Sequence, residues 1–157
     1  MARRRQIPKY GTVVHNGVIY YRTRIRDADG KRVALYGKTR EELYDKVEEA
    51  KRQIEDKIFR QKTPTVKEYT EKWLYMQSAH VRYTTMLDYT SKVKNYIIQP
   101  LGDMYMADVT QDDIKMALVP VSKKSKSVYH SVVMLLKCIF YSAEDNHLIR
   151  ENPTKRI

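Results

Sequence analysis

The sequence of 157 residues has little cysteine, tryptophan, glycine or proline: one, one, five and five residues. The single cysteine excludes a disulfide framework within the chain and is typical of a reducing compartment. No apolar run approaches the length of a membrane span, and no apolar segment follows the first residues as it would in a secretory signal. We therefore expect a cytoplasmic protein with no membrane partner.

Ligand-binding motifs are also missing. Four scattered histidines and one cysteine have no zinc-ligand spacing, and no glycine-rich phosphate loop is present. We expect no metal, no cofactor and no catalytic residue in the chain. Cys138 lies in the apolar run 132–141, which predicts a small buried residue rather than a nucleophile.

Charge of one sign is abundant. Thirty Lys and Arg against 19 Asp and Glu give a net charge of +11. Residues 1–63 hold 17 basic and 9 acidic residues, a net +8, whereas residues 64–157 hold 13 and 10, a net +3. Such an excess favours a polyanionic partner, with nucleic acid ahead of an anionic membrane.

The most informative stretch is a hairpin predicted at residues 18–37. Strands at 18–26 and 31–37 flank a turn that contains Asp27 and Gly30. Because side chains alternate between the faces of a strand, one face is apolar and the other is basic and aromatic. The second face holds Tyr20, Arg22, Arg24, Arg26, Arg32 and Tyr36. Two interpretations stay open here: an ordinary solvated sheet face, or a sheet that lies against nucleic acid.

The rest of the first part completes a small domain at residues 10–60. Residues 1–9 predict a basic flexible arm that carries Arg3, Arg4 and Arg5 and can follow a phosphate backbone. A strand at 10–15 and the turn Asn16-Gly17 give a three-stranded antiparallel sheet. Thr39 caps a helix whose apolar stripe is expected to cover the other face of the sheet, at Ile19, Ile25, Val33 and Leu35.

Beyond a linker at 61–64, helical signals replace the strand signals. Thr65, Thr84 and Thr110 are expected to cap three helices. Pro120 and the loop 123–126 then precede a fourth helix at about 127–145. The predicted fold class is α+β: a small three-stranded antiparallel sheet plus helix, followed by an all-α four-helix domain at residues 65–153.

Motifs in the second part form an ordered series. They are Val66-x-x-Tyr69-x-x-x-Trp73-Leu74, Thr84/Thr85 with Tyr89, Ile98-x-Pro100-Leu101-Gly102, Asp108-Val109-Thr110-x-x-Asp113-Ile114, Leu136-x-x-Ile139-Phe140-x-x-Ala143 and Asn152-Pro153. This series resembles the core-binding (SAM-like) domain of phage- and transposon-type tyrosine recombinases. The first part resembles the arm-type DNA-binding domain that precedes it in integrases of phages and conjugative transposons.

The resemblance implies a function. The chain would be the N-terminal half of a site-specific integrase for a mobile element, bound to arm-type and core-type sites of double-stranded DNA beside other integrase protomers in the bacterial nucleoid. The family's catalytic domain follows the Asn-Pro pair and is expected to be absent here. In the second part, the expected DNA contacts are Arg82, Tyr83, Thr84, Lys92, Lys123, Lys124, Lys126, Ser127 and His130, near helix starts or on polar helix faces.

Two other functions remain open from the sequence. The chain could be a stand-alone DNA-binding regulator without an enzyme domain. Alternatively, the helical part could be a protein-interaction module that docks neighbouring protomers.

Overall fold

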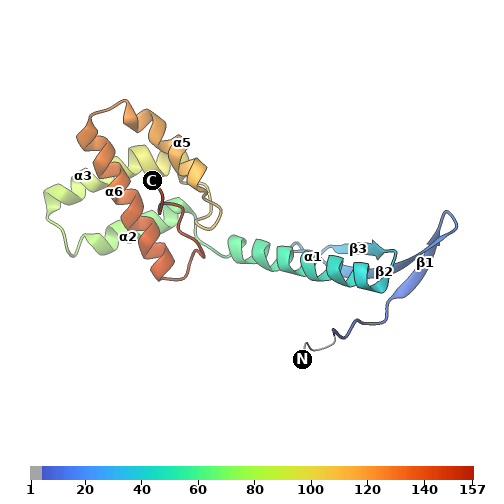
Figure 1. Cartoon of the computed structure of the whole chain (residues 1–157). Coiled ribbons are helices and arrows are strands. Elements are labelled where there is room, and N and C mark those ends of the chain that lie inside the picture. Colours follow the sequence, from blue (N-terminus) through green and yellow to red (C-terminus); the bar gives the residue numbers. More distant parts are fainter. Residues whose placement is uncertain (1–4) are drawn as a thin grey trace. The chain divides into compact units, whose positions relative to one another are not determined.

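The computed structural model describes residues 5–157, so the expected contacts Arg3 and Arg4 lie outside the described residues. The chain divides into two compact units between Phe59 and Arg60 (Figure 1). Within residues 5–157, no helix has the length and apolar character needed to cross a membrane.

The first unit contains a three-stranded antiparallel sheet in the order β1 (Gly11–His15), β2 (Val18–Arg26), β3 (Arg32–Gly37). Asn16 and Gly17 both have positive φ, 52° and 77°, which confirms the predicted two-residue turn. At the second turn, the Asp27 carboxylate accepts the backbone N–H groups of Asp29 (3.0 Å) and Lys31 (2.8 Å). This local hydrogen bonding fixes the register of β2 against β3.

Helix α1 (Arg40–Gln61) follows the sheet. The Thr39 hydroxyl accepts the Glu42 N–H at 3.1 Å, as predicted, but the Glu42 carboxylate reaches back to the N–H of Lys38 (3.0 Å). The hydrogen bond from Lys46 lowers the pKa of Glu42, with a further contribution from the Lys38 N–H. Gly37 lies close against α1: a Cβ atom at this position would be only 2.7 Å from the Leu43 nitrogen. Glycine therefore allows the sheet and the helix to approach each other here.

The predicted cover of the apolar sheet face is partly wrong. Ile25 and Leu35 are half-buried, but Ile19 and Val33 are 61% and 40% exposed. The buried residues of α1 are Leu43 and Val47, both in its N-terminal half. Figure 1 shows the tip of the β1–β2 hairpin extending beyond the start of α1, so one helix does not span the sheet. Val33 lies on β3, an edge strand of the sheet with a neighbouring strand on one side only.

The second unit is helical: α2 (Val66–Gln77), α3 (Tyr83–Val93), η1 (Lys94–Ile98), α4 (Gln99–Leu101), α5 (Gln111–Ser122) and α6 (Lys126–Asp145). Segments α3, η1 and α4 follow one another without a break, so the unit has the four helical stretches that the sequence predicts. With the sheet of the first unit, this confirms the α+β fold class.

A single hydrophobic core fills the helical unit. Helix α6 supplies the largest share of it, because its apolar residues recur every three or four positions. The α6 residues in this core are Val132, Leu135, Leu136, Ile139, Phe140 and Ala143, all with 0% exposure. Burying each large aliphatic or aromatic side chain is worth about 1.5–3 kcal/mol relative to its exposure to water.

Two of the predicted caps are confirmed and one is wrong. Thr65 with Glu68, and Thr110 with Asp113, form complete capping boxes at the starts of α2 and α5. Thr84 is not a cap, since α3 begins at Tyr83 and Thr84 is its second residue. The N-cap residue is Arg82, which makes no side-chain cap hydrogen bond.

The predicted position of Pro120 is also wrong, because this residue lies inside α5 and not in the loop that follows. The next residue, Val121, is fully buried, and this packing carries the helix on to Ser122. At Pro100 the helix accommodates the ring differently. The missing N–H and the pyrrolidine ring disturb the usual turn, and the preceding segment η1 is a π-helix with wider hydrogen bonding.

Cys138 is exposed, which contradicts the expected burial. It lies on the face of α6 that carries the exposed residues Met134 and Tyr141, opposite the buried stripe. An apolar run in a helix is not buried throughout, because each residue is rotated by about 100° from the one before it.

Candidate nucleic-acid interface

The register of the sheet sets out the basic face row by row. Residues directly opposed on neighbouring antiparallel strands share a face. On this face Val13 opposes Tyr20, Arg22 opposes Gly11 and Tyr36, Arg24 opposes Ala34, and Arg26 opposes Arg32. The structure therefore brings together all six side chains that the sequence placed on this face. We call them the cationic face: Tyr20, Arg22, Arg24, Arg26, Arg32 and Tyr36.

Arg22 is the most restrained arginine of the cationic face. Its guanidinium carbon lies 5.8 Å from the centre of the Tyr36 ring, a distance typical of a cation–π contact. On its other side Arg22 faces Gly11, and a Cβ built on Gly11 meets no atom within 4 Å. Arg22 is thus supported on one side and open on the other.

The other three arginines are exposed and unrestrained. Arg24, Arg26 and Arg32, with Ile25, line an open hollow of about 260 Å³. Among residues 5–157, no carboxylate forms an ion pair with any arginine of the cationic face. Their charges are therefore available to a ligand.

Arg5 is not part of the cationic face. Its Nη1 atom is 3.4 Å from the carboxylate of Asp45 on α1, and both side chains are largely exposed. An exposed pair of this kind contributes little to stability, so a phosphate group can compete with Asp45 for Arg5.

In the helical unit, the first group of expected contacts surrounds the start of α3. Arg82 is the N-cap residue with extended backbone, and Tyr83 and Thr84 are the first two helical residues. All three are exposed, Tyr83 by 77%. The first turn of α3 has no acidic residue and no side-chain cap, so its backbone N–H groups and the positive end of the helix dipole are not neutralised locally.

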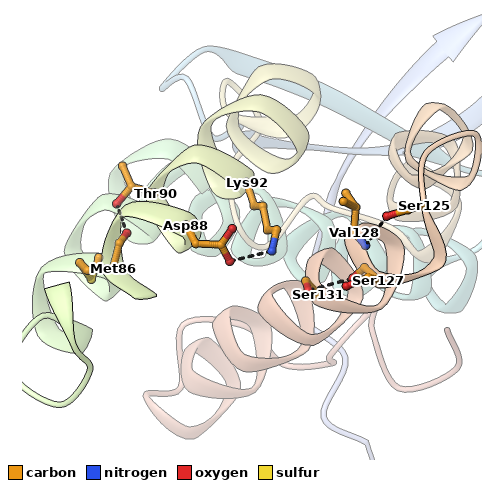
Figure 2. Close-up of polar contacts among 8 residues, drawn as sticks. All are labelled: Met86, Asp88, Thr90, Lys92, Ser125, Ser127, Val128 and Ser131. Carbon is orange, nitrogen blue, oxygen red and sulfur yellow. Dashed lines mark hydrogen bonds and ion pairs between the residues drawn. The ribbon is translucent and has the colours of Figure 1, made fainter. Parts of the chain in front are cut away.

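The second group surrounds the start of α6. Lys123 is the C-cap of α5, and Lys124 lies in the short loop that follows. Lys126 and Ser127 lie in the first turn of α6 and His130 in the second, and all five residues are exposed. The Ser125 hydroxyl accepts the Val128 N–H at 3.3 Å, while Ser131 donates to the Ser127 carbonyl at 2.9 Å (Figure 2).

Lys92 differs from the other expected contacts. Its ammonium nitrogen is 2.6 Å from the Asp88 carboxylate one turn earlier on α3, and its side chain is only 18% exposed. Figure 2 shows Lys92 and Asp88 pointing toward each other, with the Lys92 side chain directed from α3 toward α6. Helices α3 and α6 pack together, and Lys92, in the last turn of α3, has its charge largely compensated by Asp88.

Two features of the site were not predicted from the sequence: a like-charged pair, and the small residues beside two of the arginines. Arg26 and Arg32 are directly opposed across the β2–β3 turn, although like charges in that position destabilise a sheet. The sequence does contain a signal for this pairing, because counting outward from a turn of five residues pairs position 26 with position 32. Gly11 and Ala34, which leave space beside Arg22 and Arg24, were likewise not recognised.

Part of the helical unit is similar to a known family of domains. Residues 65–118 match the family model described as phage integrase, N-terminal SAM-like domain. This part of the helical unit is thus similar to such a domain, and the resemblance to the N-terminal region of tyrosine recombinases is confirmed. No curated protein matches the chain.

Three solved structures have a similar fold. An integrase-like domain from Bacillus cereus is 18% identical with a TM-score of 0.55, over 59% of this chain and 80% of that one. A fragment from Clostridium leptum is 21% identical with a TM-score of 0.54, over 60% and 86%. Lambda integrase, as a tetramer bound to a Holliday junction, is 20% identical with a TM-score of 0.60, over 99% and 46%. The chain thus spans less than half of lambda integrase.

Proposed function

We propose that the chain binds double-stranded DNA as the N-terminal, non-catalytic part of a site-specific tyrosine recombinase of a mobile element. The observation that carries the proposal is the cationic face, whose four arginines have no carboxylate partner among the described residues, in a chain whose residues 65–118 match an integrase SAM-like domain. Unpaired arginines on a twisted antiparallel sheet suit the phosphates and base edges of a duplex.

Each unit has its own role in the proposal. The first unit binds an arm-type or accessory site through the cationic face, with Arg3, Arg4 and Arg5 along the phosphate backbone. The second binds a core-type site through the starts of α3 and α6, where exposed cations adjoin backbone N–H groups. Other protomers of the same integrase would occupy neighbouring sites, as in lambda integrase, which has been solved as a tetramer on a Holliday junction and as a dimer on a core site.

Salt-dependent binding of a duplex by the whole chain tests this function. The logarithm of the binding constant is expected to fall linearly with the logarithm of the salt concentration, with a slope of about −0.9 for each phosphate neutralised. Weak binding that does not respond to salt would contradict the proposal and favour a protein-interaction module.

A matched pair of variants locates the contact. Arg24→Gln with Arg26→Gln removes two unpaired cations from the cationic face. Lys51→Gln with Arg52→Gln removes the same charge from α1, where both residues are paired with acids. The first double variant is expected to lose clearly more affinity than the second. Equal losses would mean that only net charge matters and would exclude the cationic face as a binding surface.

We expect the two described units to have no DNA-cleaving activity of their own. Cleavage by a tyrosine requires cations that hold the nonbridging phosphate oxygens beside the nucleophile. Incubation with nicked duplexes is therefore expected to give no covalent protein–DNA adduct on a denaturing gel. An adduct that disappears when one tyrosine is replaced by phenylalanine would contradict this.

A further inference from the structure

The Arg26–Arg32 pair is the last row of the β2–β3 ladder, beside the turn, and it is unusual because both residues carry the same charge. The two residues are direct cross-strand partners, so their side chains project from the same face of neighbouring strands. Two positive charges in this position repel each other and destabilise the hairpin. Within residues 5–157, neither has a carboxylate partner that would offset the repulsion.

The nearby turn has acidic residues, but they are engaged elsewhere. The Asp27 carboxylate accepts two backbone N–H groups of the turn, and the Asp29 carboxylate binds Lys57 of α1 at 3.0 Å. Both acids within three residues of Arg26 are thus held away from it. The sheet therefore keeps a like-charged pair where a single Asp or Glu would have relieved it.

The space around the pair is open. Strand β1 begins at Gly11, which pairs with Arg22, so Arg24 and Arg26 lie beyond the part of β2 that β1 covers. Ala34 opposes Arg24 and adds only a methyl group to this part of the face. The result is the hollow of about 260 Å³ that Arg24, Arg26 and Arg32 line.

We propose that Arg26 and Arg32 form a shared seat for one phosphodiester group of duplex DNA, with Arg24 at its side. The inference rests on the proposed DNA-binding function and specifies which ligand atoms this part of the cationic face takes. One anion between two guanidinium groups removes their repulsion and gains two charge-assisted hydrogen-bonding partners. Because a phosphate carries no sequence information, this seat fixes position and leaves base discrimination to other residues.

The test uses the whole chain and a short duplex of mixed sequence. Arg26→Gln, Arg32→Gln and the double variant are compared with Arg40→Gln, an exposed cation in the first turn of α1 away from the cationic face. If the two arginines share one phosphate, the double variant reduces the salt slope by about 0.9, the value for one phosphate, and each single variant reduces it by less, because the remaining arginine still contacts the phosphate.

Other slopes would overturn the proposal. A loss of about 1.8 in the double variant would mean two separate phosphates. A loss no greater than that of Arg40→Gln would mean that the pair has no contact with the duplex. In both cases salt-dependent binding by the wild type would leave the proposed function standing, whereas its absence would refute both.

The DNA-free protein gives an independent readout. At low salt, Arg32→Gln is expected to raise the unfolding midpoint, because it removes the repulsion from Arg26, and the gain is expected to vanish at high salt. Adding inorganic pyrophosphate to the wild type should reduce the same difference. A midpoint unchanged at every salt concentration would show that the two charges do not repel and would contradict the seat.

Discussion

Tyr36 determines how Arg22 is presented to a ligand. A guanidinium held over an aromatic ring loses little further freedom on binding, and this suits the planar, two-pronged contacts that arginine makes with a base edge. Arg24, Arg26 and Arg32 lack such support and suit phosphates. The cationic face therefore combines one oriented arginine with three that are free to adjust.

Tyr36→Phe keeps the ring under Arg22, whereas Tyr36→Leu removes it. An exposed cation–π contact is worth about 0.5–1 kcal/mol, so Tyr36→Leu is expected to weaken DNA binding about two- to five-fold and Tyr36→Phe to leave it near the wild type. Fluorescence titration with a duplex measures both. If the two variants bind equally well, the ring does not position Arg22.

Arg24→Ala tests whether a cationic-face residue is dispensable for folding. Its side chain is exposed and opposes only Ala34, so the unfolding midpoint should stay the same while affinity for DNA falls. Arg52→Ala is the matched control, because Arg52 is also exposed but is ion-paired with Glu49 on α1. Unchanged binding by Arg24→Ala would return this residue to an ordinary solvated surface.

At this scale, the sequence predicts which residues share a face but not how their side chains are restrained. Alternation along β2 placed the arginines on one face, since the period of a strand is fixed. The stacking of Arg22 on Tyr36 and the pairing of Lys92 with Asp88 depend on the register of the sheet and on side-chain conformations. The sequence therefore predicts Lys92 as a DNA contact without indicating its ion pair with Asp88.

The helical elements are the most predictable part of the chain where their caps are local. Thr65 and Thr110 each lie three residues before a carboxylate, and both boxes form as expected. Thr84 lacks such a partner, and the start of α3 shifted accordingly. Pro120 was misplaced because the buried Val121 extends α5, a tertiary effect that local propensity does not contain.

The cap of α2 predicts a dependence on pH. The backbone N–H and hydroxyl of Thr65 donate to the Glu68 carboxylate and lower its pKa. A group whose pKa falls on folding stabilises the folded state above its unfolded pKa, 4.5, and this contribution is lost as pH falls through the lower, folded pKa. Wild type should therefore exceed Glu68→Gln in free energy of unfolding at neutral pH, and the difference should shrink in acid.

Urea titrations across this pH range measure the effect. Glu71→Gln, on the same helix but outside the cap, is the control and is expected to show a smaller change between neutral and acidic pH. A difference between wild type and Glu68→Gln that stays constant with pH would show that the Glu68 charge does not contribute to the cap.

For the whole molecule, two separate cationic surfaces predict bivalent binding. The cationic face belongs to the first unit, whereas the starts of α3 and α6 belong to the second. One chain is therefore expected to hold two DNA segments, and two duplexes with different fluorophores should show energy transfer when the protein is added. Transfer should disappear in the Arg24→Gln, Arg26→Gln double variant. Competition of both units for one duplex, with no bridging, would contradict the prediction.

The division into a sheet unit and a helical unit followed from the change of periodicity near Pro64, because strands and helices repeat their apolar residues differently. The core of the helical unit was predictable for the same reason. The cover of the sheet was not, since the sequence does not say how far a helix reaches across it, and Ile19 remains exposed.

The position of Cys138 has a practical consequence. Because the sequence contains no other cysteine and this one is exposed on α6, a maleimide dye or spin label can be attached to the helical unit at one defined point. A second cysteine introduced at Thr12, on the exposed end of the sheet, would supply a partner in the other unit. Distances between the two labels, measured before and after addition of DNA, would then report directly how the two units move when each takes its duplex.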